Sequence, residues 1–174
     1  VAAAMKSGKR AICAGPGNPP VLVDGTSCLD NAASCTIYGA SYDNNLLCIG
    51  EKEVFVLDPF FDKFMAMLEK HGAYRLNDAQ VERLTKAAFV FPPGQGAGCP
   101  HPVVNRDLVG KDPEVLAKAA GASIPAGTQL LFAETKADHL FVEEEQMMPY
   151  LPVVRVKTVE EGIIESKKAE HGYK

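Results

Sequence analysis

Apolar and polar residues follow two patterns along this chain, and the patterns predict helices alternating with strands. Apolar residues recur at helical spacing after Asp58-Pro59, and Gly72 is placed to stop that helix near residue 71. Similar patterns predict helices over 1–7, 29–39, 78–88, 111–121 and 159–170. Short apolar or alternating runs predict strands at 9–14, 21–23, 54–56, 129–134 and 153–156. We therefore expect an α/β fold in which helices flank a mostly parallel sheet.

Single residues are expected to mark the ends of some elements. Ser27 and Asn77 are placed to cap the helices that follow them, because their side-chain oxygens can accept hydrogen bonds from free backbone N–H groups. Residues 91–106 are rich in proline and glycine, which neither a helix nor a strand accommodates well. An irregular loop is expected there.

The composition supports one domain with a substantial core and excludes several classes of function. The chain has 174 residues, of which 47% are hydrophobic, and this suffices to bury an interior. No run of about 18 apolar residues occurs, so no membrane span is expected. The net charge is −4 with both signs interspersed, and no basic stripe points to nucleic acid.

The cysteines argue against a disulfide or zinc framework. Their number, five, is odd, and no C-x-x-C pair occurs. The four histidines form no cluster with them, so no metal site is predicted. The start of the chain lacks the features of a signal peptide, which favours a reducing, intracellular setting. The chain also begins at Val1, in a helical pattern without an initiator Met, which predicts a fragment of a longer protein.

Cys48 is the most informative cysteine because it joins a polar turn to a strand. In that strand Val54 and Val56 should lie on one face and Phe55 on the other. A cysteine at such a junction can be a nucleophile, and it can equally be a small core residue. The remaining cysteines are interpreted as structural: Cys13 in the strand at 9–14, Cys28 and Cys35 on one helical face, and Cys99 in the loop.

Three segments together carry a family resemblance. They are residues 5–20 (MKSGKRAICAGPGNPP), 42–48 (YDNNLLC) and 144–154 (EEQMMPYLPVV), and residues 108–111 (LVGK) and 170–174 (EHGYK) agree with them. This set resembles the CoA-acylating branch of the aldehyde dehydrogenase superfamily, above all the propionaldehyde and acetaldehyde dehydrogenases of bacterial microcompartments. The resemblance covers nearly the whole chain and keeps the order of the motifs.

The resemblance implies a domain organisation. In that family a dinucleotide-binding domain precedes the catalytic domain and continues after it. Residues 1–18 would be the end of the dinucleotide-binding domain, and residues 19–174 would be the catalytic domain that carries the thiol nucleophile. The rest of the dinucleotide-binding domain would be missing, and an isolated fragment of this kind is expected to be inactive.

The resemblance also implies the chemistry of Cys48. Its thiolate would attack an aldehyde, and loss of hydride to NAD would leave an acyl thioester on sulfur. Ala14 stands where the hydrolytic relatives carry the glutamate of a Glu-Leu-Gly-Gly motif. An alanine cannot activate water, so the acyl group would pass to the thiol of CoA. Ala14 can also be simply a small residue beside a tight turn.

Three residues are candidates for cofactor binding by the same resemblance. Gly15 and Gly17 would let the backbone lie close to the nicotinamide, although they can also merely form the turn. Glu145 matches the glutamate of the superfamily's Glu-x-Phe-Gly-Pro motif, which binds ribose hydroxyls. The Phe-Gly pair is replaced here by Met147-Met148, and a solvated acidic run is the alternative.

The expected function is CoA-acylating oxidation of a short aldehyde, with propionaldehyde favoured, and with NAD and coenzyme A as co-substrates. Two alternatives remain open. One is a phosphate-dependent semialdehyde dehydrogenase of the same superfamily, and the other is a non-catalytic interaction or scaffold domain. The resemblance leaves a homo-oligomer and microcompartment shell proteins open as partners, in the cytoplasm or inside a microcompartment.

Overall fold

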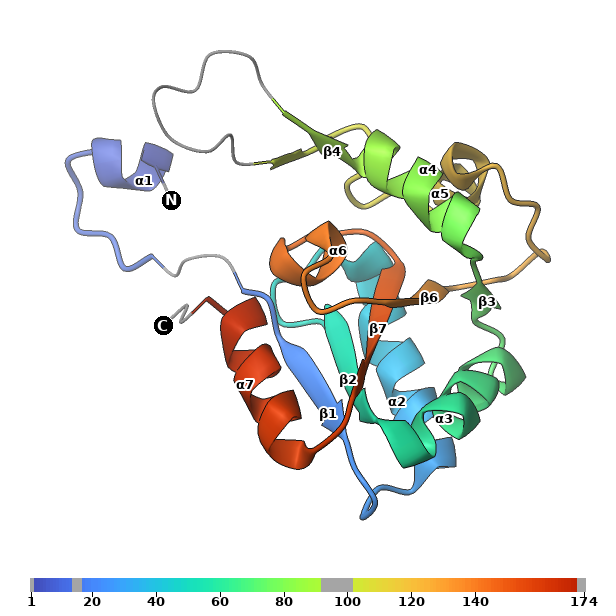
Figure 1. The fold of residues 1–174 in the computed structure, drawn as a ribbon. Helices are drawn as coiled ribbons and strands as arrows, with labels where there is room; N and C mark the ends of the chain where they lie inside the picture. The colour runs from blue at the N-terminus through green and yellow to red at the C-terminus, as the bar shows by residue number, and fades with distance from the viewer. Residues whose placement is uncertain (1, 14–16, 92–101, 172–174) are drawn as a thin grey trace.

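A parallel sheet organises the structure, which is a computed structural model describing residues 2–13, 17–91 and 102–171 (Figure 1). Its strand order is β1-β2-β7-β6-β3, and every neighbouring pair is parallel. The strands are β1 (Pro20–Val23), β2 (Glu53–Leu57), β3 (Tyr74–Arg75), β6 (Leu131–Thr135) and β7 (Tyr150–Val156). The expectation of an α/β fold with a mostly parallel sheet is confirmed.

Helices connect these strands and cover both faces of the sheet. The helices are α1 (Ala2–Lys6), α2 (Leu29–Ser41), α3 (Asp58–Lys70), α4 (Asp78–Ala88), α5 (Pro113–Ala120), α6 (Leu140–Glu143) and α7 (Val159–Ala169), and a 3₁₀ turn, η1, covers Tyr42–Asn45. In Figure 1, α7 lies along β1 on one side, while α2 and α3 pack together on the other. The predicted helices all occur, with ends displaced by a few residues at most.

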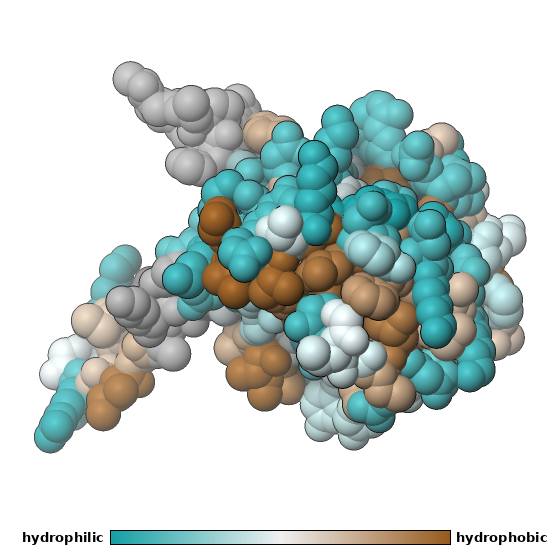
Figure 2. Space-filling model, turned by 60° about the horizontal axis from the view of Figure 1, so that its bottom comes forward, coloured by the Kyte–Doolittle hydropathy of each residue, from teal (hydrophilic) through white to brown (hydrophobic). Residues whose placement is uncertain are grey.

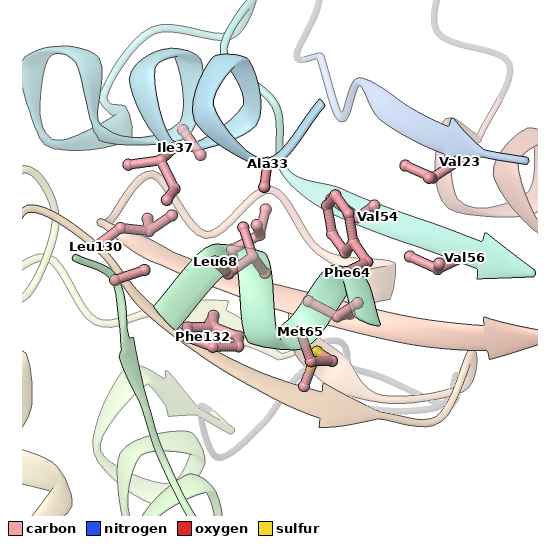
Figure 3. Close-up of a cluster of buried hydrophobic side chains, with 14 of the residues drawn as sticks. Val23, Ala33, Ile37, Val54, Val56, Phe64, Met65, Leu68, Leu130 and Phe132 are labelled. Carbon is pink, nitrogen blue, oxygen red and sulfur yellow. The ribbon is translucent and has the colours of Figure 1, made fainter. Parts of the chain in front are cut away.

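The central core lies between the sheet and the pair α2 and α3. Val54 and Val56 of β2 meet Phe64 of α3 in this cluster, as Figure 3 shows. Phe55 points to the opposite face, where it packs with Val142 of α6 and with residues of β7 and α7. The predicted alternation of faces along β2 is therefore confirmed, and both faces of this central strand are buried.

A second core cluster lies around α4 and α5. It joins these helices to the sheet through Leu131 and Tyr150, and the tilted rings of Phe141 and Tyr150 pack with centroids 4.4 Å apart. Next to it, β4 (Phe89–Val90) and β5 (Val103–Val104) form a two-stranded antiparallel ribbon. The expectation of an irregular loop over 91–106 is wrong at β5; residues 92–101 lie outside the described residues.

The predicted strand at 9–14 is wrong in the part that the structure describes. Residues 10–13 have no regular secondary structure, Ile12 is 94% exposed, and Cys13 is exposed as well. An apolar run becomes a strand only where a neighbouring strand takes its backbone hydrogen bonds. The first strand of the described sheet is β1, which pairs with β2 alone.

Two expectations about helix caps had different outcomes. Asn77 caps α4 as expected: its side chain accepts a hydrogen bond from the backbone N–H of Gln80 at 3.0 Å. Ser27 does not cap α2, whose N-cap residue is Cys28 and has no side-chain cap bond. The Ser27 hydroxyl instead accepts a hydrogen bond from the backbone N–H of Asp24.

The surface mixes hydrophilic residues with local apolar areas. Figure 2 shows brown, apolar residues gathered in the middle of one face and bordered by teal, hydrophilic ones. Within the described residues, no helix is both long and apolar enough to cross a membrane.

Candidate active site

Three of the predicted site residues lie on loops that enter neighbouring parallel strands. Gly17 precedes β1, Cys48 precedes β2, and Glu145 precedes β7. Because β1, β2 and β7 are adjacent and parallel, their amino ends meet at one edge of the sheet. Segments that are far apart in the sequence are thereby brought to one place.

The loop that carries Cys48 leaves the thiol exposed. It is entered through three consecutive residues in the left-handed region, Asp43, Asn44 and Asn45, with φ of 49°, 52° and 57°. Aspartate and asparagine tolerate this conformation better than other residues with a side chain. Asp43 and the two asparagines therefore form the turn that leads to Cys48.

Gly17 lies directly against Cys48. A Cβ atom added at Gly17 would come within 2.5 Å of the Cys48 carbonyl oxygen, closer than any side chain allows. The backbone of one loop thus touches the backbone of the other. The close approach is what requires glycine here. Backbone conformation does not require it, since Gly17 is not among the glycines with a positive φ.

Glu145 completes this group of residues. Burial raises the pKa of its carboxyl above the usual range, and the ammonium of Lys52 and the backbone N–H of Gly17 act in the opposite direction. One carboxyl oxygen, Oε1, is buried and has no hydrogen-bond partner among the described residues. A half-buried carboxylate with a free acceptor is suited to bind hydroxyl groups of a ligand.

Lys52 is a site residue that the sequence analysis did not single out. Its side chain is fully buried, and Nζ donates hydrogen bonds to the backbone carbonyls of Asn45 and Leu47 at 2.7 and 3.0 Å and to Asn45 Oδ1 at 2.7 Å. Burial lowers the pKa of Lys52 to about 8. A lysine at the entrance of an otherwise apolar strand was the signal that could have identified it.

Glu145 opposes this lowering of the Lys52 pKa most, and Cys48 follows it. The buried cation is therefore within electrostatic range of both predicted functional groups.

Gln146 ties two of the three loops together. It is fully buried, and its side-chain amide donates to the backbone carbonyls of Lys52 and Tyr150, each at 3.0 Å. A buried amide that bonds to two main chains fixes their relative position. Gln146 thus lies in the interior, whereas the acidic residues before it are exposed at Glu143 and half-buried at Glu144 and Glu145.

The remaining candidates lie elsewhere or outside the described residues. Ala14, Gly15 and Cys99 belong to the segments that the structure does not describe. Cys28 and Cys35 are exposed, so the expectation that they pack in the interior is wrong. In the described ranges no three or more His, Cys, Asp or Glu residues are grouped to hold a metal ion.

The fold and the site define an α/β protein with an exposed thiol held at the amino edge of a parallel sheet. Glycine, glutamate and a buried lysine surround the loop that bears this thiol. Such a site can form a covalent bond from sulfur to an electrophilic carbon.

Comparison with known proteins places the chain in a family. No protein-family model matches it. The acetylating acetaldehyde dehydrogenase EutE of Salmonella typhimurium is 44% identical over 171 residues, which are 98% of this chain and 36% of that protein. A propionaldehyde dehydrogenase from the fucose utilisation microcompartment of Clostridium phytofermentans superposes with a TM-score of 0.86 at 38% identity, covering 99% of this chain and 38% of that one.

A second solved structure is informative about the thiol. The propionaldehyde dehydrogenase of Rhodopseudomonas palustris, solved with bound CoA and an acylated cysteine, has a TM-score of 0.85 at 37% identity, covering 99% of this chain and 37% of that one. The chain belongs to the CoA-acylating aldehyde dehydrogenases, as the sequence resemblance implied. It spans about a third of the length of the relatives that it matches.

Proposed function

We propose that this chain supplies the catalytic cysteine of a CoA-acylating aldehyde dehydrogenase, and that Cys48 is that cysteine. The observation that carries the proposal is the exposed Cys48 thiol on a loop held by Gly17 and Lys52. The acylated cysteine in the related structure from Rhodopseudomonas palustris supports it.

The chemistry proceeds through sulfur. The Cys48 thiolate forms a bond to the aldehyde carbon, and the carbonyl oxygen takes a proton to give a thiohemiacetal. A bound dinucleotide would supply the acceptor for the hydride that leaves this carbon, and the proton would leave the oxygen, which converts the adduct on Cys48 into a thioester. The thioester on Cys48 then exchanges with the CoA thiol, which yields acyl-CoA and frees Cys48. The overall change converts aldehyde, CoA and NAD⁺ into acyl-CoA, NADH and a proton.

Residues 1–18 and 19–174 are proposed as the end of the dinucleotide-binding domain and the catalytic domain. Glu145 is proposed to bind the ribose hydroxyls of the dinucleotide, with Gly15 and Gly17 beside the nicotinamide. The unpartnered, buried Oε1 of Glu145 fits this role, because a hydroxyl donor would satisfy it. A Glu145→Gln variant, which cannot accept as strongly, should raise the KM for the dinucleotide more than it lowers kcat.

We propose that water does not hydrolyse the thioester, because Ala14 offers no base that could activate it. The thioester is then left to the CoA thiol. The substrate is proposed to be a short aliphatic aldehyde such as propionaldehyde. Large apolar side chains flank the thiol, with Leu47 39% and Ile49 79% exposed, and they suit an apolar chain better than a charged one.

The partners and location are proposed from the relatives. The microcompartment origin of the related enzyme from Clostridium phytofermentans supports a place in such a compartment. Shell proteins and other copies of the protein are the partners that this place would offer.

A direct test uses the full-length protein with propionaldehyde, CoA and NAD⁺. Cys48→Ala should abolish NADH formation and acyl-CoA formation, while Cys28→Ala, which removes another exposed thiol, should leave both unchanged. Full activity of the Cys48→Ala variant would refute the proposal. An assay with phosphate in place of CoA distinguishes the alternative, a phosphate-dependent semialdehyde dehydrogenase, because that enzyme would release an acyl phosphate.

A further inference from the structure

The loop that bears Cys48 closes on a buried lysine. Lys52 lies four residues after Cys48, and its Nζ donates hydrogen bonds to the carbonyls of Asn45 and Leu47, which precede Cys48 in the chain. The loop also carries its own bond, from the backbone N–H of Gly50 to the Leu47 carbonyl at 3.2 Å. Hydrogen bonds thereby connect the two ends of the segment from Asn45 to Lys52, which contains Cys48.

Lys52 itself is held rigidly by the sheet. Its backbone N–H donates to the Pro19 carbonyl at 3.0 Å, and its carbonyl accepts from Gln146 Nε2 at 3.0 Å. Asn45, which accepts from Nζ, in turn donates from Nδ2 to the Glu51 carbonyl at 3.0 Å. The backbone of Lys52 is bonded to the segments that precede the neighbouring strands and its Nζ to the loop, so Lys52 fixes the position of the loop relative to the sheet.

The chemistry of the anchor matters as well as its geometry. A buried ammonium is costly, and an apolar residue of similar length would fill the same space without that cost. The three hydrogen bonds to Nζ satisfy all its protons. The titratable groups in range of Nζ are Glu145 from the β7 loop, Cys48 and Glu51 from the same loop as Lys52, and Glu53 from β2, whose carboxyl is protonated at neutral pH.

We propose that Lys52 is a positioning residue for Cys48: its buried amine fixes the loop that presents the thiol, and its positive charge supports negative charge on sulfur. The proposal rests on Cys48 being the nucleophile. Lys52 does not touch the substrate carbon; it acts through the loop and through its field. A lysine in this place does both, whereas a neutral residue could at most fill the space.

The test compares three variants of the full-length protein. Lys52→Met removes the charge and the donors at nearly constant length, and Lys52→Arg keeps the charge. Glu53→Gln is the matched control, because it changes the adjacent, equally buried residue. The measurements are kcat, KM, the melting temperature, and the rate of Cys48 alkylation by iodoacetamide, located by tandem mass spectrometry.

In Lys52→Met, kcat should fall by at least about tenfold with KM for aldehyde and CoA changed by less than about threefold. Alkylation of Cys48 should slow by about tenfold near neutral pH, while alkylation of the exposed Cys28 stays the same. Lys52→Arg should recover part of the alkylation rate, and Glu53→Gln should alter neither rate. A folded Lys52→Met protein with wild-type kcat and alkylation overturns the proposal.

A comparison of pH profiles decides the matter even if Lys52→Met does not fold. Lys52 loses its proton as the pH rises through about 8, whereas the arginine of Lys52→Arg keeps its charge. Between about pH 6.5 and about pH 9.5 the ratio of the Cys48 to the Cys28 alkylation rate should therefore fall more steeply in the unmodified protein than in Lys52→Arg. An equal fall in both proteins overturns the proposal. If Cys48→Ala leaves the activity unchanged, the proposed function is overturned instead. The failure of the Lys52 proposal and the failure of the proposed function are therefore distinguishable.

Discussion

Glu53 shows how far burial can change the state of a single residue. Its side chain is fully buried, and neither carboxyl oxygen has a hydrogen-bond partner among the described residues. Burial raises the pKa of Glu53 to about 9, with Lys52 acting in the opposite direction. The carboxyl is therefore protonated at neutral pH, because an isolated charge in this position would be too costly.

This state makes stability depend on pH through Glu53. Between its unfolded pKa of 4.5 and its folded pKa of about 9, the folded protein holds a proton that the unfolded chain has lost. The free energy of unfolding should thus fall as the pH rises through this window. Glu53→Gln, which is always neutral, should remove that slope and raise stability near pH 7 by on the order of 1–3 kcal/mol. Denaturant unfolding at several pH values up to about 8 would show this, and parallel curves for both proteins would contradict it.

Gly17 is the second residue whose role depends on its surroundings. Gly17→Ala places a Cβ against the Cys48 carbonyl, at 2.5 Å in the undisturbed structure, so one of the two loops must move. We expect kcat and the rate of Cys48 alkylation to fall by about tenfold or more, because the thiol loses its position. Gly127→Ala is the control: it strains a glycine with φ of 83° but meets no atom within 4 Å. That variant should lose stability and keep the reactivity of Cys48.

At the scale of elements, the capping box of α4 is the clearest local signal in the chain. The side chain of Asn77 accepts from the Gln80 N–H, and the Gln80 side chain accepts from the Asn77 N–H at 2.9 Å. These two bonds satisfy groups that a helix start otherwise leaves free. The pattern is local, which explains why the sequence analysis placed this helix correctly.

Removal of the cap provides a prediction at the same scale. Asn77→Ala should lower the free energy of unfolding by about 1 kcal/mol. Ser27→Ala should change it by less than about 0.5 kcal/mol, because Ser27 does not cap α2 and its hydroxyl makes only a 3.4 Å contact with the Asp24 N–H. Denaturant unfolding of both variants measures the difference. Equal losses would show that Ser27 contributes as much as a true cap.

At the scale of the whole molecule, stability depends on the core between the sheet and the helices α2 and α3. Phe64 is fully buried at its centre and is surrounded by side chains of the strands and of both helices (Figure 3). Phe64→Ala should lower the free energy of unfolding by about 3–5 kcal/mol, since it removes apolar contacts and leaves a cavity.

The exposed apolar residue Ile164 of α7 serves as the comparison. Its side chain is 52% exposed, so Ile164→Ala should cost less than about 0.5 kcal/mol in denaturant unfolding. A loss for Phe64→Ala that is no greater than this would contradict the assignment of the core.

The sequence alone determined the elements whose signals are local. Helical spacing located α2, α3, α4 and α7, and the β2 pattern of Val54, Phe55 and Val56 gave the correct faces. The helix and strand predictions succeeded because periodicity is a property of short segments. Family resemblance proposed Cys48, Gly17 and Glu145 as candidates, and their roles stay predictions.

Only the tertiary structure decided what depends on distant segments. Whether residues 10–13 pair as a strand, and whether β3, β4 and β5 exist, depends on neighbours that local patterns do not name. The contact of Gly17 with Cys48 arises because adjacent parallel strands bring their amino ends together. The buried amine of Lys52 could be recognised only once the loop from Asn45 to Leu47 was seen to fold back over it, because hydrogen bonds and burial are set by the folded chain.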